Sequence, residues 1–301
     1  MTTFTHTLSD LEEKLTAGES LTTPDLARVL ACPDLVSVGV LGEMARRAAS
    51  GDTITFCRVA AVTGDESSFE TGEAGEVRIT AEPASIDDAR RRVQAVRPGA
   101  AGRPVTGFSL ADLLALCGHD HMALAEAIAA LRGDGLEAVA ETPVDRFDST
   151  DVLVESLRAA IHAGVAVPRF TIDRADLAHR QRLIAIVADV QRELGCGRAF
   201  APLPRVDPVE TPSTGYDDVK TIALARLHCP ANLIVQVDWP LYGPKLAQVA
   251  LAYGAGDVDG VSPVDTLNLG TRRSPLEEIL RQIRAAGGVP VERDGRFQPK
   301  G

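Results

Sequence analysis

From about residue 135 onward, short apolar segments alternate with helical segments of ten or more residues, and this alternation constrains the fold more than any other feature. The short segments are apolar on both faces, as expected for strands of a parallel sheet that is covered on both sides. Neighbouring parallel strands need a long crossover between them, and each helical segment supplies one. This part of the chain therefore predicts repeated β/α units.

The same pattern extends back to residue 53, which gives about seven or eight candidate strands. The predicted strands are Thr53–Val62, Glu76–Thr80, Val105–Phe108, Leu136–Ala140, Val165–Ile172, Arg198–Leu203, Leu233–Val237 and Val258–Val261. We expect an α/β fold, a full or partial (β/α)8 TIM-type barrel. A doubly wound open sheet is the second choice, although no G-x-G-x-x-G motif follows a strand.

The first fifty residues predict helices without intervening strands. Ser9 and Glu12 form a capping box, and Pro24 stands in a first helical turn, where its missing N–H costs nothing. A third helical segment ends at Gly51. We therefore expect an N-terminal helical extension over residues 1–50 and a barrel domain over residues 51–301.

Composition narrows the class of protein and its partners. The net charge of −11 disfavours nucleic-acid binding, which normally needs a basic face. The N-terminus has neither a basic start nor an apolar core, so we expect no signal peptide, and no apolar run is long enough to cross a membrane. The five cysteines (Cys32, Cys57, Cys117, Cys196 and Cys229) are scattered, which predicts a reducing, cytoplasmic location and no local metal motif.

Acidic residues and arginines follow several predicted strands, at the end of the barrel where active sites lie. Glu141, Asp173 and Asp238 are candidate catalytic bases, because carboxylates gathered at one mouth can accept protons. The candidate substrate-binding residues are Arg174, Arg205, Asp207, Trp239 and Asp259. For any single carboxylate, the alternative is an ordinary helix N-cap. We predict no metal ligands.

Four blocks from about residue 199 onward carry a resemblance to a known family. They read FAPLPRVDPVET, STGYDDVKTIALARLHCP, WPLYGPKLAQVALAYGAGDVDG and SPLEEILRQIRAAGGVPVERD, in this order. Together they resemble the C-terminal half of aminofutalosine synthase and its relatives, dehypoxanthine futalosine cyclase and the deazaflavin (FO) synthase subunits. The resemblance implies the radical S-adenosylmethionine class and, for the first two enzymes, menaquinone synthesis by the futalosine route.

The chain departs from this family after its first strand. The family has CxxxCxxC there, which holds a [4Fe–4S] cluster that binds S-adenosylmethionine, whereas this chain reads CRVAAVTGDE. Cys57 has no partner at either spacing, and three thiolates are the minimum for such a cluster. We therefore expect no cofactor and no radical chemistry of the family type.

Two functional hypotheses remain open. In the first, the protein belongs to menaquinone biosynthesis and binds a futalosine- or chorismate-derived metabolite at an acidic barrel mouth. If it is an enzyme, it would then perform non-radical lyase, hydrolase or transferase chemistry. In the second, it is a non-catalytic paralogue that acts as a scaffold or regulator of a menaquinone-pathway enzyme. An unrelated use of the barrel is a weaker third hypothesis, because fold does not fix function.

Overall fold

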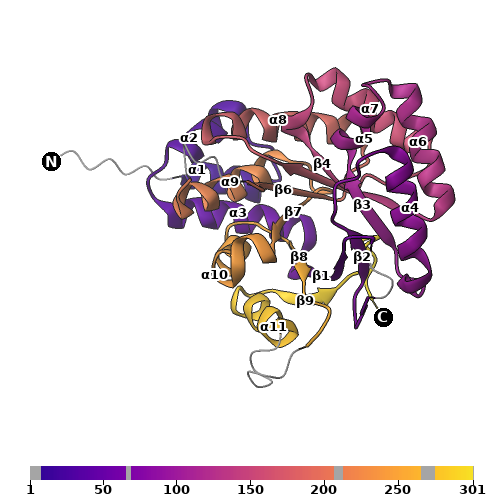
Figure 1. The fold of residues 1–301 in the computed structure, drawn as a ribbon. Coiled ribbons are helices and arrows are strands. Elements are labelled where there is room, and N and C mark those ends of the chain that lie inside the picture. Colours follow the sequence, from indigo (N-terminus) through magenta and orange to yellow (C-terminus); the bar gives the residue numbers. More distant parts are fainter. Residues whose placement is uncertain (1–7, 66–68, 207–212, 266–274, 301) are drawn as a thin grey trace.

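The strands of the computed structural model form one parallel sheet that closes into a barrel (Figure 1). The structure describes residues 8–65, 69–206, 213–265 and 275–300. Strands β1 to β8 are neighbours in chain order, and β8 pairs with β1. The strands are β1 (Thr53–Val62), β2 (Glu76–Ile79), β3 (Val105–Ser109), β4 (Ala138–Pro143), β5 (Arg169–Ile172), β6 (Ala199–Pro204), β7 (Ile234–Asp238), β8 (Asp257–Val261) and β9 (Val289–Glu292). The predicted (β/α)8 barrel is confirmed.

Helices surround this barrel, most of them as crossovers between successive strands (Figure 1). The α-helices are α1 (Ser9–Thr16), α2 (Thr23–Ala31), α3 (Leu35–Ser50), α4 (Ile86–Val96), α5 (Leu110–Leu116), α6 (His121–Asp134), α7 (Thr150–His162), α8 (Leu177–Leu194), α9 (Gly215–His228), α10 (Trp239–Ala252) and α11 (Pro275–Ala285). Short 3-10 turns, η1 (Arg97–Ala100) and η2 (Val144–Arg146), follow α4 and β4. The three predicted N-terminal helices are present before β1, while their separation from the barrel as a domain stays a prediction.

Strand β9 is an addition that the sequence did not predict. Its residues pair in parallel with Thr53–Phe56 of β1, whereas Val59–Val62 of the same strand pair with β2. The two halves of β1 therefore have different neighbours along one edge. Strand β9 includes Pro290, and none of its four residues is fully buried, so it lacks the buried apolar pattern of a recognisable strand.

The apolar core lies between the barrel and the helices, and the barrel interior is polar. In β2, the buried residues Val77 and Ile79 belong to the apolar core, while Glu76 and Arg78, which alternate with them along the strand, make ion pairs inside the barrel. Strand alternation explains this division, because successive side chains point to opposite faces of a strand. The expectation that strands are apolar on both faces is therefore wrong for several inner positions.

Helix α3 packs closely against the end of α10 through a glycine. A Cβ atom built on Gly42 would lie 2.2 Å from the backbone oxygen of Tyr253, a distance at which the helix must move. A Cβ atom on Gly39, one turn earlier, would lie 3.4 Å from the Tyr253 ring, an ordinary contact. The close approach at Gly42 therefore fixes α3 against the barrel helices.

We expect Gly42→Ala to lower the free energy of unfolding by between about 1 and 3 kcal/mol, because the added methyl group overpacks a backbone contact. Gly39→Ala is the matched control on the same helix. It should leave stability unchanged or raise it slightly, since alanine has the higher helix propensity. Urea denaturation of the three proteins measures the difference. Equal stability of the two variants would contradict a tight α3 contact.

Candidate functional site

Three of the predicted site residues meet over the barrel mouth. The Nε atom of Arg205, just beyond β6, lies 2.7 Å from Oε2 of Glu141, and its Nη1 lies 2.9 Å from Oδ2 of Asp238. Burial alone would lower the pKa of Arg205, but the charges of the two carboxylates raise it. Arg205 therefore bridges β4 and β7 as a fixed cation, and both predicted bases are ion-paired.

Strand β4 ends later than predicted, so Glu141 lies within the strand instead of after it. Asp238 ends β7 and also accepts a hydrogen bond from the backbone N–H of Leu241, which makes it the N-cap of α10. The N-cap alternative therefore applies to Asp238, although its second oxygen still faces Arg205. The catalytic roles of Glu141 and Asp238 stay predictions.

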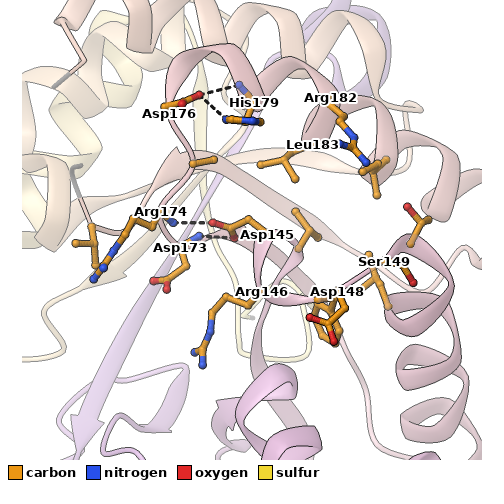
Figure 2. Close-up of a pocket in the computed structure, with 17 residues that line it drawn as sticks. Asp145, Arg146, Asp148, Ser149, Asp173, Arg174, Asp176, His179, Arg182 and Leu183 are labelled. Carbon is orange, nitrogen blue, oxygen red and sulfur yellow. Dashed lines mark hydrogen bonds and ion pairs between the residues drawn. The ribbon is translucent and has the colours of Figure 1, made fainter. Parts of the chain in front are cut away.

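A groove of about 910 Å³ opens beside the mouth, at the ends of β4, β5 and β6 (Figure 2). Its centre is organised by Asp145, whose carboxylate accepts hydrogen bonds from the backbone N–H groups of Asp173 at 2.8 Å and Arg174 at 2.7 Å. These bonds hold the segment between β5 and α8. Apolar side chains, among them Leu153 and Leu183, form part of the wall. The groove thus has the size and mixed lining of a small-molecule site.

Two arginines of this groove have no side-chain acceptor in the described part of the chain. Arg174 and Arg182 are exposed, and Figure 2 shows them at different ends of the groove. The groove's carboxylates are mostly engaged. Asp176 accepts a hydrogen bond from the backbone N–H of His179, which lowers the pKa of Asp176. Burial lowers the pKa of Arg146, but Asp112, which pairs with it at 2.7 Å, and to a lesser extent the predicted base Asp173 raise that pKa. Two cations are thus left for an external ligand.

The lining is not uniformly positive. Asp148 has no ion-pair partner within the described ranges, and Asp173 is only half-buried. The catalytic role of Asp173 and the substrate-binding role of Arg174 stay predictions, although both residues do line the groove. Arg182 was missed by the sequence reasoning, because it lies on a helix and not at the end of a strand.

Below the mouth, three carboxylates and three arginines fill the barrel interior. Asp259 lies 2.7 Å from Arg78, 3.3 Å from Arg169 and 3.3 Å from Arg293. Glu76 pairs with Arg78, and Asp257 pairs with Arg293. Formal charges balance within this group, which we call the interior charge column (Glu76, Arg78, Arg169, Asp257, Asp259 and Arg293).

The arginines of the interior charge column lower the pKa values of its carboxylates Asp259 and Glu76. Burial raises the pKa of the Asp259 carboxyl, but Arg169, Arg78 and Arg293 outweigh burial and hold that pKa well below its usual range. The pKa of Glu76 is lowered to about 2 against burial, mainly by Arg78 and Arg169. Asp259 is fully buried and already ion-paired, so its predicted role in substrate binding stays a prediction that would need this group to rearrange.

Cys57 points into the same interior. Its Sγ atom lies 3.9 Å from Oε2 of Glu76, and Asp259 lies near enough for the three residues to form a candidate metal centre. Burial raises the pKa of the Cys57 thiol strongly, which favours the neutral thiol over the thiolate that binds metals. The three arginines of the charge column also already neutralise the carboxylates. This cluster therefore gives no support for a bound cation.

Two predicted substrate-binding residues lie outside the groove. Trp239 begins α10 and packs, partly buried, against the apolar core, so its substrate role stays a prediction. Asp207 falls outside the described residues. No described helix is both long and apolar enough to cross a membrane.

Fold and site together define a barrel protein with a polar interior and a ligand-sized groove at the carboxyl ends of its strands. The chain shares its fold with methylornithine synthase, at a TM-score of 0.61 and 17% identity, over 94% of this chain and 97% of that one. No protein-family model matches the chain.

Sequence relatives give a more specific placement. The chain is 25% identical over 272 residues to 5-amino-6-(D-ribitylamino)uracil–L-tyrosine 4-hydroxyphenyl transferase 2 of Methanosarcina acetivorans. This alignment covers 76% of this chain and 69% of the relative. The chain is also 32% identical over 142 residues to aminodeoxyfutalosine synthase of Streptomyces coelicolor, in an alignment that covers 40% of this chain and 36% of that enzyme. These relatives are enzymes of the radical S-adenosylmethionine fold class, so the resemblance is supported at the level of this class.

The expectation that the protein has no cofactor is contradicted by these relatives. Enzymes of this class normally use a [4Fe–4S] cluster and S-adenosylmethionine, and nothing in the described residues shows a protein that works without a cofactor. The residues present nevertheless do not fit the family's cluster motif. Cys57 is buried within β1, and the other four cysteines lie at or beyond helix ends on other elements. We therefore derive no chemical step through a cluster.

Proposed function

We propose that the protein binds a small anionic metabolite, of the futalosine- or chorismate-derived type, in the groove beside its barrel mouth, and that it belongs to menaquinone biosynthesis. The observation that carries this proposal is the pair of exposed arginines, Arg174 and Arg182, in a groove of about 910 Å³. The similarity to aminodeoxyfutalosine synthase supports the metabolite class.

The groove matches the two chemical parts of such a ligand. A carboxylate would accept charge-assisted hydrogen bonds from one guanidinium, in the bidentate geometry that arginine favours. An apolar or aromatic body would lie on the side chains of Leu153 and Leu183, which close one wall. Glu141 and Asp238 would lie beside the ligand as candidate bases, but each would first have to be released from Arg205.

The proposal is tested by thermal denaturation of the purified protein with chorismate, 3-(1-carboxyvinyloxy)benzoate, aminofutalosine, futalosine and S-adenosylmethionine. A ligand at about 100 times its Kd stabilises the native state by about 2.7 kcal/mol, so one metabolite should raise the melting temperature by several degrees. Arg182→Gln should weaken binding by roughly 10- to 100-fold, because a hydrogen bond to a charged group contributes about 1.5–3 kcal/mol.

Arg198→Gln is the matched control. Arg198 is also exposed, has no side-chain partner in the described ranges and precedes β6, at the opposite end of the barrel from the groove. The control should bind the metabolite like the native protein. No shift with any metabolite, or equal binding by the Arg182 and Arg198 variants, would overturn the proposal.

A second candidate function is a scaffold or regulator of a menaquinone-pathway enzyme. It is favoured by apolar side chains that are exposed around the mouth, after β5, β6 and β7. They are Leu177, Val206, Tyr216 and Leu241. A partner protein could cover such side chains. Failure of every metabolite in the binding test would favour this second function.

A further inference from the structure

A second pocket lies at the opposite end of the barrel from the groove. Its volume is about 370 Å³, and it is lined by Arg97, Arg132, Gly135, Leu136, Glu137 and Gly164. These residues lie around the carboxyl ends of α4, α6 and α7, before β3, β4 and β5 begin. The groove lies where β4 and β5 end, and the six residues of β4 alone span about 20 Å. The two sites share no residue.

Arg132 is the cation of this pocket that has no partner. The residue is exposed, and its guanidinium has no acceptor in the part of the chain that the structure describes. Arg132 stands in the last turn of α6, where the helix dipole favours a basic residue. That dipole amounts to only about half a negative charge, so it does not neutralise an arginine. Positive charge therefore remains for an external anion.

Two glycines leave room for the arginine side chains of this pocket. A Cβ atom built on Gly164 would lie 2.7 Å from Nη1 of Arg132, and one built on Gly135 would lie 2.9 Å from Cδ of Arg97. Each arginine therefore lies directly against the backbone of a glycine that has a positive φ. The backbone N–H groups of both glycines already bond to carbonyls of the preceding helices. The guanidinium groups are thus the donors that face a ligand.

Glu137 is the carboxylate of the lining, and it is shared between two arginines. Its side chain lies 2.7 Å from Arg296 and 3.5 Å from Arg97. Arg296 also pairs with Asp294 at 3.3 Å. With Arg132, three guanidinium groups face two carboxylates, which leaves one positive charge at the pocket.

We propose that this pocket binds a phosphate group, either as free inorganic phosphate or as the phosphate of a small metabolite. Phosphate accepts paired hydrogen bonds from the planar guanidinium of arginine, and Arg97 and Arg132 reach the pocket from different helical segments. The net charge of the chain is −11, so a phosphate that binds is held by a local site and not by general attraction. The inference is independent of the metabolite proposed for the groove.

The test is isothermal titration calorimetry with inorganic phosphate and with glycerol 3-phosphate, in about 0.15 M sodium chloride to screen non-specific attraction. Arg132→Gln should weaken binding about 10- to 100-fold, because hydrogen bonds to a charged group are lost. Arg198→Gln is the matched control. Arg198 is exposed at the same end of the barrel, outside the pocket, and has no side-chain partner in the described ranges. This control should bind phosphate like the native protein.

Two further variants change the pocket without removing Arg132. Glu137→Gln should tighten binding about two- to fivefold, because it releases Arg97 from a competing carboxylate. Gly164→Ala should weaken binding, since the added Cβ atom displaces the Arg132 guanidinium. Gly195→Ala is its control, because Gly195 also has a positive φ but a Cβ atom there would meet nothing within 4 Å. A tightened variant cannot be explained by damage to the fold.

The outcomes decide whether the site exists and which phosphate it takes. Binding of glycerol 3-phosphate that depends on Arg132 supports a site for a phosphorylated metabolite, and binding of inorganic phosphate alone supports a site for the free ion. Absence of binding by the native protein, or equal binding by the Arg132 and Arg198 variants, overturns the inference. Neither result affects the proposed function, since its test depends on Arg182 in the groove.

Discussion

Replacing Asp259 with asparagine is expected to lower the free energy of unfolding by about 3–5 kcal/mol, the usual cost of breaking a buried ion pair from one side. Asp259 is fully buried and lies within 3.3 Å of guanidinium nitrogens from Arg78, Arg169 and Arg293. Asparagine has nearly the same size, so the change removes charge and not volume. Three buried arginines would then face two carboxylates. Urea denaturation at pH 7 measures the loss.

A second variant separates charge imbalance from general damage. Arg78→Met combined with Asp259→Asn restores the charge balance of the interior column. Because the two residues are in contact, we expect the double variant to lose less stability than the sum of the two single variants. Asp10→Asn, which removes the exposed pair between Arg28 and Asp10, should change stability little. A loss below about 1 kcal/mol for Asp259→Asn would contradict a buried charge column.

The strands could be predicted from the sequence because they depend on local pattern. Six helical crossovers, those that join β2 through β8, follow from short apolar runs and the helices between them. The predicted end of β4 differs from the observed end by three residues, which is why Glu141 was expected just after the strand. The interior charge column could not be predicted. Arg78 and Asp259 are 181 residues apart, and Arg293 follows the unpredicted β9. The sequence shows each arginine within or beside an apolar segment. The carboxylate that pairs with it is brought near only when the barrel closes.

The candidate site shows the same limit. Residues at strand ends, such as Asp173 and Arg174, were found from sequence because a barrel gathers these ends at one face. Arg182 was not, since it reaches the groove from the second turn of α8. The pairing of Arg205 with two carboxylates also depends on side-chain geometry across three strands. The sequence predicts where a residue lies along its strand. It does not predict which charged side chains pair with one another across strands.

Acid should destabilise the protein through the same charge column. The folded-state pKa of Glu76 is about 2, against an ordinary value of 4.5, and that of Asp259 is also well below its usual range. A group whose pKa is lowered by folding contributes stability that is present above the unfolded pKa and is lost as pH falls towards the folded pKa. The lowering at Glu76 alone corresponds to on the order of 3 kcal/mol, lost between about pH 5 and pH 2.

The measurement is the free energy of unfolding in urea at pH 7, 5, 4 and 3, for the native protein and for Glu76→Gln. Other carboxylates with lowered pKa values, such as Asp88, also contribute to the native slope. The difference between the two proteins isolates Glu76, since glutamine does not titrate. The variant should be the less stable protein at pH 7, and the gap should narrow as pH falls. If the difference in unfolding free energy between the two proteins stayed constant from pH 7 to pH 3, the arginines would not be lowering the pKa of Glu76.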